Sequence, residues 1–121
     1  MRIKITTIDN SKYQRFETWY SFEKTDQVLR SHNDKPSFIV YYESGKVDYK
    51  EWHQNDKLHR SNNKPSLVSY SGNGKVCYKE WYLDGRQYSE QDYKQIIEQV
   101  KAMSDAEKLL DSRWWVREMV K

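Results

Sequence analysis

The chain has 121 residues, of which 15% are aromatic and 32% are charged, and its formal net charge at pH 7 is +3. This length favours one domain, and so small a net charge is weaker than the clustered basic excess of a committed nucleic-acid binder. The single cysteine, Cys77, excludes an internal disulfide and a multi-cysteine zinc site.

We expect the protein to be soluble and cytoplasmic. Residues 1–5 are too few and too charged for a secretion signal, and no apolar run reaches membrane-spanning length. One cysteine also fits a reducing compartment.

The chain opens with a predicted hairpin. Residues 2–7 alternate between apolar and polar side chains, as a half-buried strand does, and residues 13–22 predict a second strand rich in aromatics. Trp19 falls where later units have Trp52 and Trp81. Residues 1–28 are therefore interpreted as an irregular first copy of a repeat, with an insertion around residues 23–27.

Residues 29–57 and 58–86 contain one unit written twice. Identical residues recur at a spacing of 29 without a gap: Leu29/Leu58, Lys35/Lys64, Pro36/Pro65, Tyr41/Tyr70, Gly45/Gly74, Val47/Val76, Tyr49/Tyr78 and Trp52/Trp81. Such a period indicates a tandem structural repeat. Each unit predicts a proline-containing turn, a first strand (38–42 and 67–70) and a second strand (46–53 and 75–83).

The hairpin loop of each unit decides which side chains share a face. A three-residue loop closed by a left-handed glycine sets Tyr41 opposite Val47, whereas a two-residue loop would shift the register by one. The apolar pattern favours the three-residue loop. It predicts a core face of Ile39, Tyr41, Val47, Tyr49, Val68, Tyr70, Val76 and Tyr78, and an opposite face with Lys50, Trp52, Lys79 and Trp81 beside Asp48 and Cys77.

Residues 87–121 change to a helical period. Ser89 is a predicted N-cap, followed by Tyr93, Ile96, Ile97, Val100 and Met103 at helical spacing. Residues 104–107 form a capping-box sequence that opens a second helix with Leu109, Leu110, Trp114, Val116, Met119 and Val120 as its apolar residues. We therefore predict one α+β domain over residues 1–121: an antiparallel meander of three hairpins, about six strands, followed by two C-terminal amphipathic helices.

The repeat resembles the MORN-like repeats found in bacteriophages, large DNA viruses and bacteria. The residues that carry the resemblance are Leu58, His59, Arg60, Pro65, Tyr70, Gly74, Glu80, Trp81 and Gly85, with a less complete match in the first unit. Lys35 and Lys64 depart from the family pattern, which has Gly there. The resemblance implies a stack of hairpins and a scaffold or binding role. It also suggests a phage-encoded inhibitor of a host defence protein, acting in the host cytoplasm.

The candidate partner surface consists of Trp19, Lys50, Trp52, Lys79, Trp81, Trp114 and Trp115. Aromatic anchors beside cations are typical of interface hot spots. The alternative for the tryptophans is packing beneath the helices or the connecting loops. For Trp114 and Trp115 the open alternatives are completing the core, forming a homodimer seam, or lining a partner groove.

Two other functions are weighed against protein binding. Lysines at equivalent positions, above all Lys50 and Lys79, form short basic ribbons that would suit a nucleic-acid backbone. His32 and His59 could converge on a phosphate in a small nuclease or toxin. The histidines are not equivalent in the repeat, however, and no carboxylate or cysteine stands at ligand spacing. We therefore predict a non-enzymatic protein-binding module without metal or cofactor, and nucleic-acid binding is the alternative.

Overall fold

The strands follow one another in chain order across one antiparallel sheet. The computed structural model describes the backbone of residues 2–9, 14–23, 26–29, 31 and 34–120, and the side chains of residues 31 and 34–120. The elements are β1 (Arg2–Asp9), β2 (Gln14–Glu23), β3 (Asp26–Leu29), β4 (Phe38–Tyr41), β5 (Val47–Glu51), β6 (His53–Gln54), β7 (Lys57–Leu58), β8 (Leu67–Tyr70), β9 (Val76–Leu83), β10 (Arg86–Tyr88), α1 (Glu90–Lys101), α2 (Asp105–Leu109) and α3 (Trp114–Glu118).

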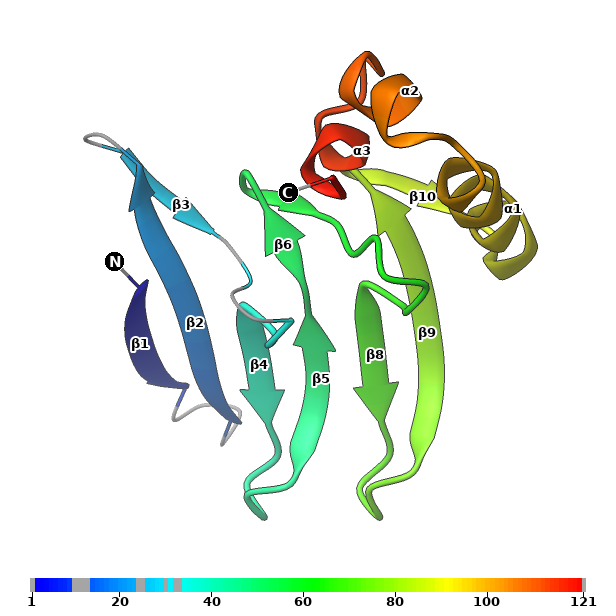
Figure 1. Cartoon of the computed structure of the whole chain (residues 1–121). Helices are drawn as coiled ribbons and strands as arrows, with labels where there is room; N and C mark the ends of the chain where they lie inside the picture. The colour runs from blue at the N-terminus through cyan, green and yellow to red at the C-terminus, as the bar shows by residue number, and fades with distance from the viewer. Residues whose placement is uncertain (1, 10–13, 24–25, 30, 32–33, 121) are drawn as a thin grey trace.

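The main sheet runs in the order β1-β2-β4-β5-β8-β9-β10, with β3 paired to β2, while β6 and β7 form a small hairpin of their own. The helices follow the strands and gather at the β9–β10 end of the sheet, where α1 packs against both strands (Figure 1). The predicted α+β class, a meander followed by helices, is confirmed. In the part of the chain that is described, strands β1, β2, β4, β5 and β8 lie side by side in a single layer (Figure 1).

The two copies of the repeat share one backbone shape. Gly45 and Gly74 close the hairpin loops with φ of 89° and 87°, and Asp34 and Asn63 hold φ of 59° and 65° in the preceding turns. All four lie in the left-handed region, which glycine, asparagine and aspartate tolerate best. The period of the sequence is therefore also a period of the structure.

Each unit also contains a third, short strand that the predicted meander of about six strands did not include. Asn55 and Asp56 both have positive φ, as do their equivalents Asp84 and Gly85. Two consecutive positive φ values define a tight hairpin turn. The turns create the β6–β7 pair in the first unit and the pairing of β9 with β10 in the second.

The first hairpin follows the same plan with a longer arm. Tyr20 pairs with Leu29, which is the equivalent of the pairing between His53 and Leu58. Beyond this point β2 and β3 continue for three more pairs, as far as Glu23, whereas β6 and β7 continue for one. The predicted insertion therefore lengthens this hairpin by two residue pairs. The backbone of Trp19 occupies the position in the first hairpin that the backbone of Trp52 occupies in the next unit.

A β-bulge in each unit overturns the predicted core face. The ladder pairs Tyr41 with Val47, as predicted, but then pairs Val40 with Tyr49, so that Asp48 is left out. One extra residue reverses the alternation of side chains beyond it. Tyr49 therefore faces away from Tyr41, and the same shift at the equivalent position of the second unit moves Tyr78 in the same way.

The bulges sort the central strands into two chemically different faces. Residues directly opposite each other on neighbouring strands lie on the same side of a sheet. The first side, here named the lysine face, carries Ile39, Tyr41, Val47, Lys50, Val68, Tyr70, Val76 and Lys79. The second, named the glutamate face, carries Phe38, Val40, Tyr49, Glu51, Leu67, Ser69, Tyr78 and Glu80.

The helices cover the end of the lysine face. The Ser89 hydroxyl caps α1 by accepting a hydrogen bond from the backbone N–H of Asp92, as predicted for the N-cap. The apolar side of α1 buries Tyr93, Ile97 and Val100 against Leu83, Trp115 and Val116. Leu83 lies four residues beyond Lys79 on β9, so it points to the same side. Among the described residues, none of the helices has the length and apolar content needed to cross a bilayer.

The predicted second helix is broken into two. α2 begins at the predicted capping box, formed by Ser104 and Glu107, but ends at Leu109, and α3 begins only at Trp114. The Asp111 carboxylate causes the break because it accepts hydrogen bonds from the backbone N–H and the guanidinium of Arg113. The prediction of one continuous second helix was therefore wrong. None of the residues of α2 is buried.

Candidate functional site

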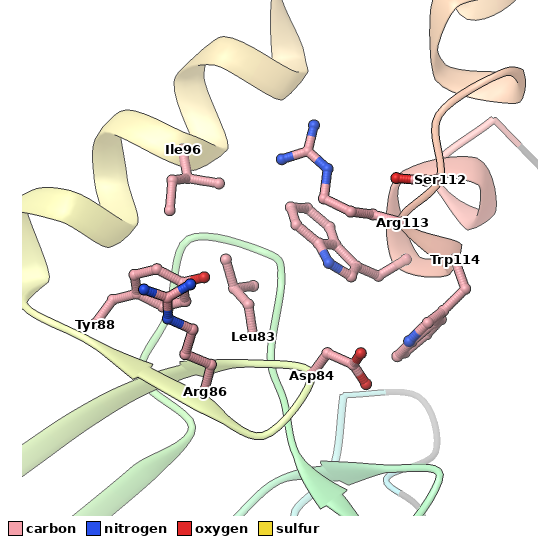
Figure 2. Close-up of a pocket in the computed structure, with 9 residues that line it drawn as sticks. Leu83, Asp84, Arg86, Tyr88, Ile96, Ser112, Arg113 and Trp114 are labelled. Carbon is pink, nitrogen blue, oxygen red and sulfur yellow. The ribbon is translucent and has the colours of Figure 1, made fainter.

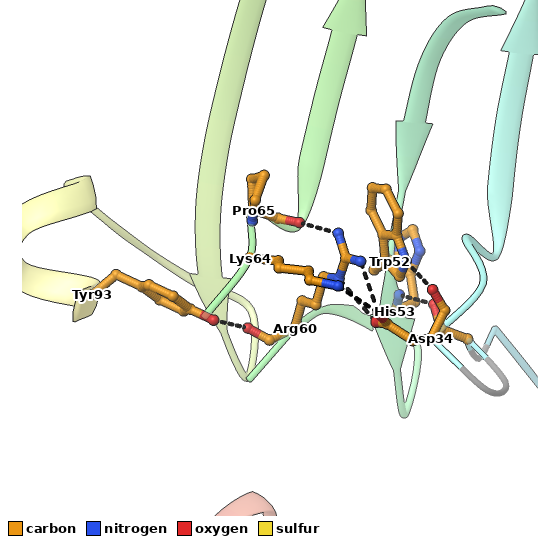
Figure 3. Close-up of polar contacts among 8 residues, drawn as sticks. Asp34, Trp52, His53, Arg60, Lys64, Pro65 and Tyr93 are labelled. Carbon is orange, nitrogen blue, oxygen red and sulfur yellow. Dashed lines mark hydrogen bonds and ion pairs between the residues drawn. The ribbon is translucent and has the colours of Figure 1, made fainter. Parts of the chain in front are cut away.

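Trp52 is enclosed rather than presented. Its side chain is only 6% exposed, and its indole N–H donates to the backbone carbonyl of Asp34 at 2.9 Å. The Arg60 guanidinium covers the ring, with Cζ 3.9 Å from the ring centroid (Figure 3). The prediction that Trp52 belongs to the partner surface is therefore wrong, because a connecting loop covers the side chain that a partner would have to contact.

The cover over Trp52 is a polar network that ties the two units together. Arg60 donates to both carboxylate oxygens of Asp34 at 2.9 Å and to the carbonyl of Pro65 at 3.1 Å (Figure 3). Burial raises the pKa of Asp34, but the hydrogen bonds and charge of Arg60, helped by Asn62 and Lys64, outweigh it and hold this pKa below its ordinary value. Asp34 is therefore ionised at neutral pH.

The same network reaches the helices through Tyr93. The hydroxyl of this buried residue of α1 donates to the carbonyl of Arg60 at 2.5 Å (Figure 3). Burial is the largest cause that raises the pKa of Tyr93, to about 12. Arg60 therefore holds the turn of the first unit with its side chain and the first helix with its backbone.

Trp81, Trp114 and Trp115 converge on the core beneath the helices. Trp115 is 4% exposed, while Trp81 and Trp114 are half-buried and pack against the same cluster. Because Trp115 is buried, a partner cannot reach it. The prediction that it belongs to the partner surface is therefore also wrong. Of the large apolar residues near the C-terminus, Leu110 is the most exposed, at 87%.

His59 lies among these tryptophans. Its ring centroid is 4.8 Å from that of Trp114 and 5.9 Å from that of Trp115. Its Nδ1 accepts the backbone N–H of Asp84 at 2.9 Å, which assigns the proton of the neutral ring to Nε2. Burial lowers the pKa of His59 to about 4. This histidine fixes a turn and is neutral at pH 7.

His53 is enclosed in a comparable way. Its Nδ1 lies 2.6 Å from the Ser37 hydroxyl, and its Nε2 lies 3.4 Å from a carboxylate oxygen of Glu51. Burial lowers the pKa of His53 to about 4, so the ring is neutral at pH 7 and its approach to Glu51 is not an ion pair. His32 lies outside the described residues. Within those residues, no three histidine, cysteine, aspartate or glutamate side chains gather as a metal site would require.

Lys50 and Lys79 share a face, as predicted, but the bulges place them on the side of Ile39 and Val68 and not on the opposite side. Both lysines pair with Val68, from its two neighbouring strands, so the three form one row across the sheet. The Lys50 ammonium lies 5.6 Å from the centre of the Tyr70 ring. Lys79 is exposed and Lys50 half-buried. Unlike Trp52 and Trp115, neither lysine is buried.

The glutamate face carries an aromatic and acidic cluster. Glu80 accepts hydrogen bonds from the hydroxyls of Tyr78 and Tyr82, at 2.8 and 2.7 Å. The hydrogen bond to Glu80, followed by burial, raises the pKa of Tyr82 to about 12. Burial, followed by the charge of Glu80, raises the pKa of Glu51. Sequence analysis missed this cluster because the bulge had to be known before Tyr78 could be placed beside Glu80.

A pocket of about 390 Å³ opens between the β9–β10 hairpin and the helices. Its lining residues are Leu83, Asp84, Arg86, Tyr88, Ile96, Ser112, Arg113, Trp114 and Trp115 (Figure 2). Both arginines stack on rings, Arg86 on Tyr88 and Arg113 on Trp115, each at 5.3 Å. Arg113 is also paired with Asp111. The pocket combines an apolar floor with a cationic rim that the sequence did not indicate.

Among the strands whose side chains are described, β9 has the most exposed large apolar residues. Val76 is 49% exposed on the lysine face and Tyr78 is 52% exposed on the glutamate face. Residues 76–79 are exposed without interruption. The side chain of Trp19, the remaining member of the predicted surface, lies outside the described residues. The candidate site is therefore the open hairpin β8–β9, with Lys79 and Tyr78 on its two sides.

No protein-family model, no curated protein and no solved structure matches the chain. The resemblance to MORN-like repeats therefore stays a prediction.

Proposed function

We propose that the chain is a non-enzymatic module that binds a protein partner through the open hairpin β8–β9. The observation that carries this proposal is the exposure of Val76 and Tyr78 on opposite sides of one strand, at 49% and 52%. Both side chains flank the same exposed stretch of strand, residues 76–79, so one partner that docks along this strand would contact both. Tyrosine is also enriched where interfaces bury large side chains with one polar group.

Charge favours a protein over a nucleic acid as the partner. Lys50 and Lys79 are two strands apart, roughly 10 Å given the usual spacing between strands, and Val68 separates them. The other side of the same strands carries Glu51 and Glu80, which would repel a phosphate backbone. A mixed surface of this kind supports contact with a protein of mixed charge.

The state of the histidines supports a role without catalysis. His59 is 4% exposed and His53 is 7% exposed, and both are held by hydrogen bonds within the fold. General acid–base chemistry needs a group within hydrogen-bond reach of a substrate and a pKa near the operating pH. Burial lowers both of these pKa values to about 4.

The cellular compartment and the biological role that we propose are supported by the sequence. Cys77 is an exposed free thiol, which supports a reducing cytoplasm as the compartment. A narrower role, inhibition of a host defence protein by a phage-encoded chain, is supported by the MORN-like resemblance of the repeat alone.

The test is capture of a partner at low and high salt from lysate with and without nuclease treatment. We expect a protein that the chain retains at both salt concentrations and loses when Tyr78→Ser and Val76→Ser are combined. Leu110→Ser is the matched control, because it removes an exposed apolar residue away from the sheet. Capture that survives the double substitution would refute the role of the hairpin. Capture that requires nucleic acid, or that Lys50→Glu with Lys79→Glu abolishes only at low salt, would favour the nucleic-acid alternative.

A further inference from the structure

Strand β9 is only partly covered on its outer side, so its first residues form an open edge of the sheet. β9 pairs with β8 along one side, but on its other side β10 pairs only with Trp81, Tyr82 and Leu83. No described strand pairs with the outer side of residues 76–80. Unpaired backbone groups along a strand are a template for another strand.

The repeat shows which kind of strand fits this edge. In the first unit the outer side of β5 pairs with β8, with Lys50 opposite Val68 and Glu51 opposite Leu67. The equivalent residues of the second unit, Lys79 and Glu80, belong to the same tetrapeptide, Tyr-Lys-Glu-Trp. The open edge of β9 therefore has the sequence and the backbone register of an edge that is filled elsewhere in the molecule.

The direction of the backbone groups follows from the hydrogen bonds at the ends of these strands. The Trp52 N–H donates to the Ser66 carbonyl at 2.8 Å, toward β8, while the Glu51 carbonyl accepts from the opposite side, from Ser37. Backbone groups alternate along a strand, so Lys50 also points toward β8. By the same alternation, the N–H and C=O of Lys79 point to the open side.

We propose that the outer edge of β9 accepts an extended strand from the protein partner, which pairs antiparallel with residues 78–80. This proposal rests on the proposed function and specifies its geometry. Main-chain hydrogen bonds would supply affinity, and alternate side chains would supply specificity.

The chain's own strands define the chemistry of the partner segment. β4 and β8 are both preceded by Pro-Ser, and both continue with a large apolar residue, a β-branched residue, a variable residue and Tyr. A partner residue at the position of Val68 lies beside Lys79 on the lysine face. A partner residue at the position of Leu67 lies beside Glu80 and the tyrosines of the glutamate face. The partner segment is therefore an uncharged, β-branched and aromatic strand.

The test uses a fluorescent peptide with the sequence of residues 64–71, Lys-Pro-Ser-Leu-Val-Ser-Tyr-Ser, titrated with the whole chain. We expect saturable binding by anisotropy, weakened at least tenfold by Lys79→Pro and little changed by Lys79→Ala. The same peptide N-methylated at its valine lacks the N–H that faces the edge and should bind at least tenfold more weakly. This modified peptide tests the edge even if Lys79→Pro disturbs the fold.

The repeat offers a matched control for folding. Lys50→Pro removes an N–H that β8 uses and should lower the melting temperature, whereas Lys79→Pro removes an N–H that faces solvent. Peptide binding that is equal with and without the valine N–H would overturn the proposal. Self-association that Lys79→Pro abolishes would assign the edge to a second copy and overturn it as well. Loss of peptide binding with continued, Tyr78-dependent capture of a partner would refute the edge alone and leave the proposed function standing.

Discussion

The guanidinium of Arg60 stacks on the ring of Trp52, with Cζ 3.9 Å from the ring centroid, and the two residues lie in different units of the repeat. The contact closes the lysine face at its helical end and leaves it open between β4 and β9. Arg60 is fixed in this position because the same fork binds both oxygens of Asp34. The loop that joins the two repeats thus buries Trp52, although both units have a tryptophan at this position.

Replacing Arg60 with Lys should destabilise the fold. Lysine keeps the charge but loses the planar fork that bonds Asp34 and covers Trp52. Loss of a cation–π contact and of a bidentate ion pair at a largely buried site predicts a decrease of about 1–2 kcal/mol in the free energy of unfolding. Urea denaturation measures this difference.

The control is Lys64→Met. Lys64 lies 3.7 Å from the same carboxylate of Asp34, but its side chain is 58% exposed. An exposed ion pair of this kind contributes about 0.5 kcal/mol or less. Equal losses in the two variants would show that Arg60 acts only as a charge.

The repeat and its turn glycines could be predicted from the sequence, whereas the bulge in each unit could not. The period of 29 and its glycines were visible because Gly45 and Gly74 are needed at positive φ, which few other residues tolerate. The bulge was not visible, because Asp48 and its equivalent Cys77 share no side-chain chemistry that marks it. Without the bulge, Tyr49 and Tyr78 were assigned to the face of Tyr41 and Tyr70, and Lys50 and Lys79 to the opposite face. The structure reverses both assignments.

The candidate site was predicted only in part, because some of its features depend on contacts between units of the repeat. Lys50 and Lys79 share a face because they occupy equivalent positions of the repeat and both pair with Val68. Burial of Trp52 depends on Arg60, which comes from the next unit, and alternation along one strand carries no information about it. The broken helix at Asp111 depends on a local hydrogen bond to Arg113 that the apolar pattern also does not contain.

Gly74→Ala should destabilise the hairpin without any steric clash. A Cβ added at Gly74 meets nothing within 4 Å, but φ is +87°. The cost is therefore that of a left-handed backbone, about 1–2 kcal/mol. Gly72→Ala in the same loop is the control, since that position is equally open and does not have the left-handed φ. Thermal unfolding of the two variants should differ, and identical melting temperatures would argue against the loop conformation.

Stability should fall in mild acid because of the buried histidines. The pKa of His59 is lowered from 6.5 to about 4 by burial, so the unfolded chain binds more protons than the folded chain between these values. Linkage then makes the free energy of unfolding decrease as the pH falls from about 6.5 to about 4, by at most about 3 kcal/mol for this residue.

The contribution of His59 is isolated by His59→Asn. Asparagine can still accept the N–H of Asp84 but does not titrate. Urea denaturation at several pH values should show a smaller decrease for the variant than for the original chain. The same pH dependence in both would assign the acid sensitivity to other groups.

The most direct test of an open last repeat is amide hydrogen exchange at Lys50 and Lys79 in the free chain. Both amides follow a tyrosine within the same tetrapeptide, so their intrinsic exchange rates are matched. The structure places β8 against β5 on the side to which the Lys50 N–H points, and no described strand against the equivalent side of β9. We predict strong protection at Lys50 and exchange close to the unprotected rate at Lys79. Equal protection at the two amides would show that the edge of β9 is already covered and would contradict the account.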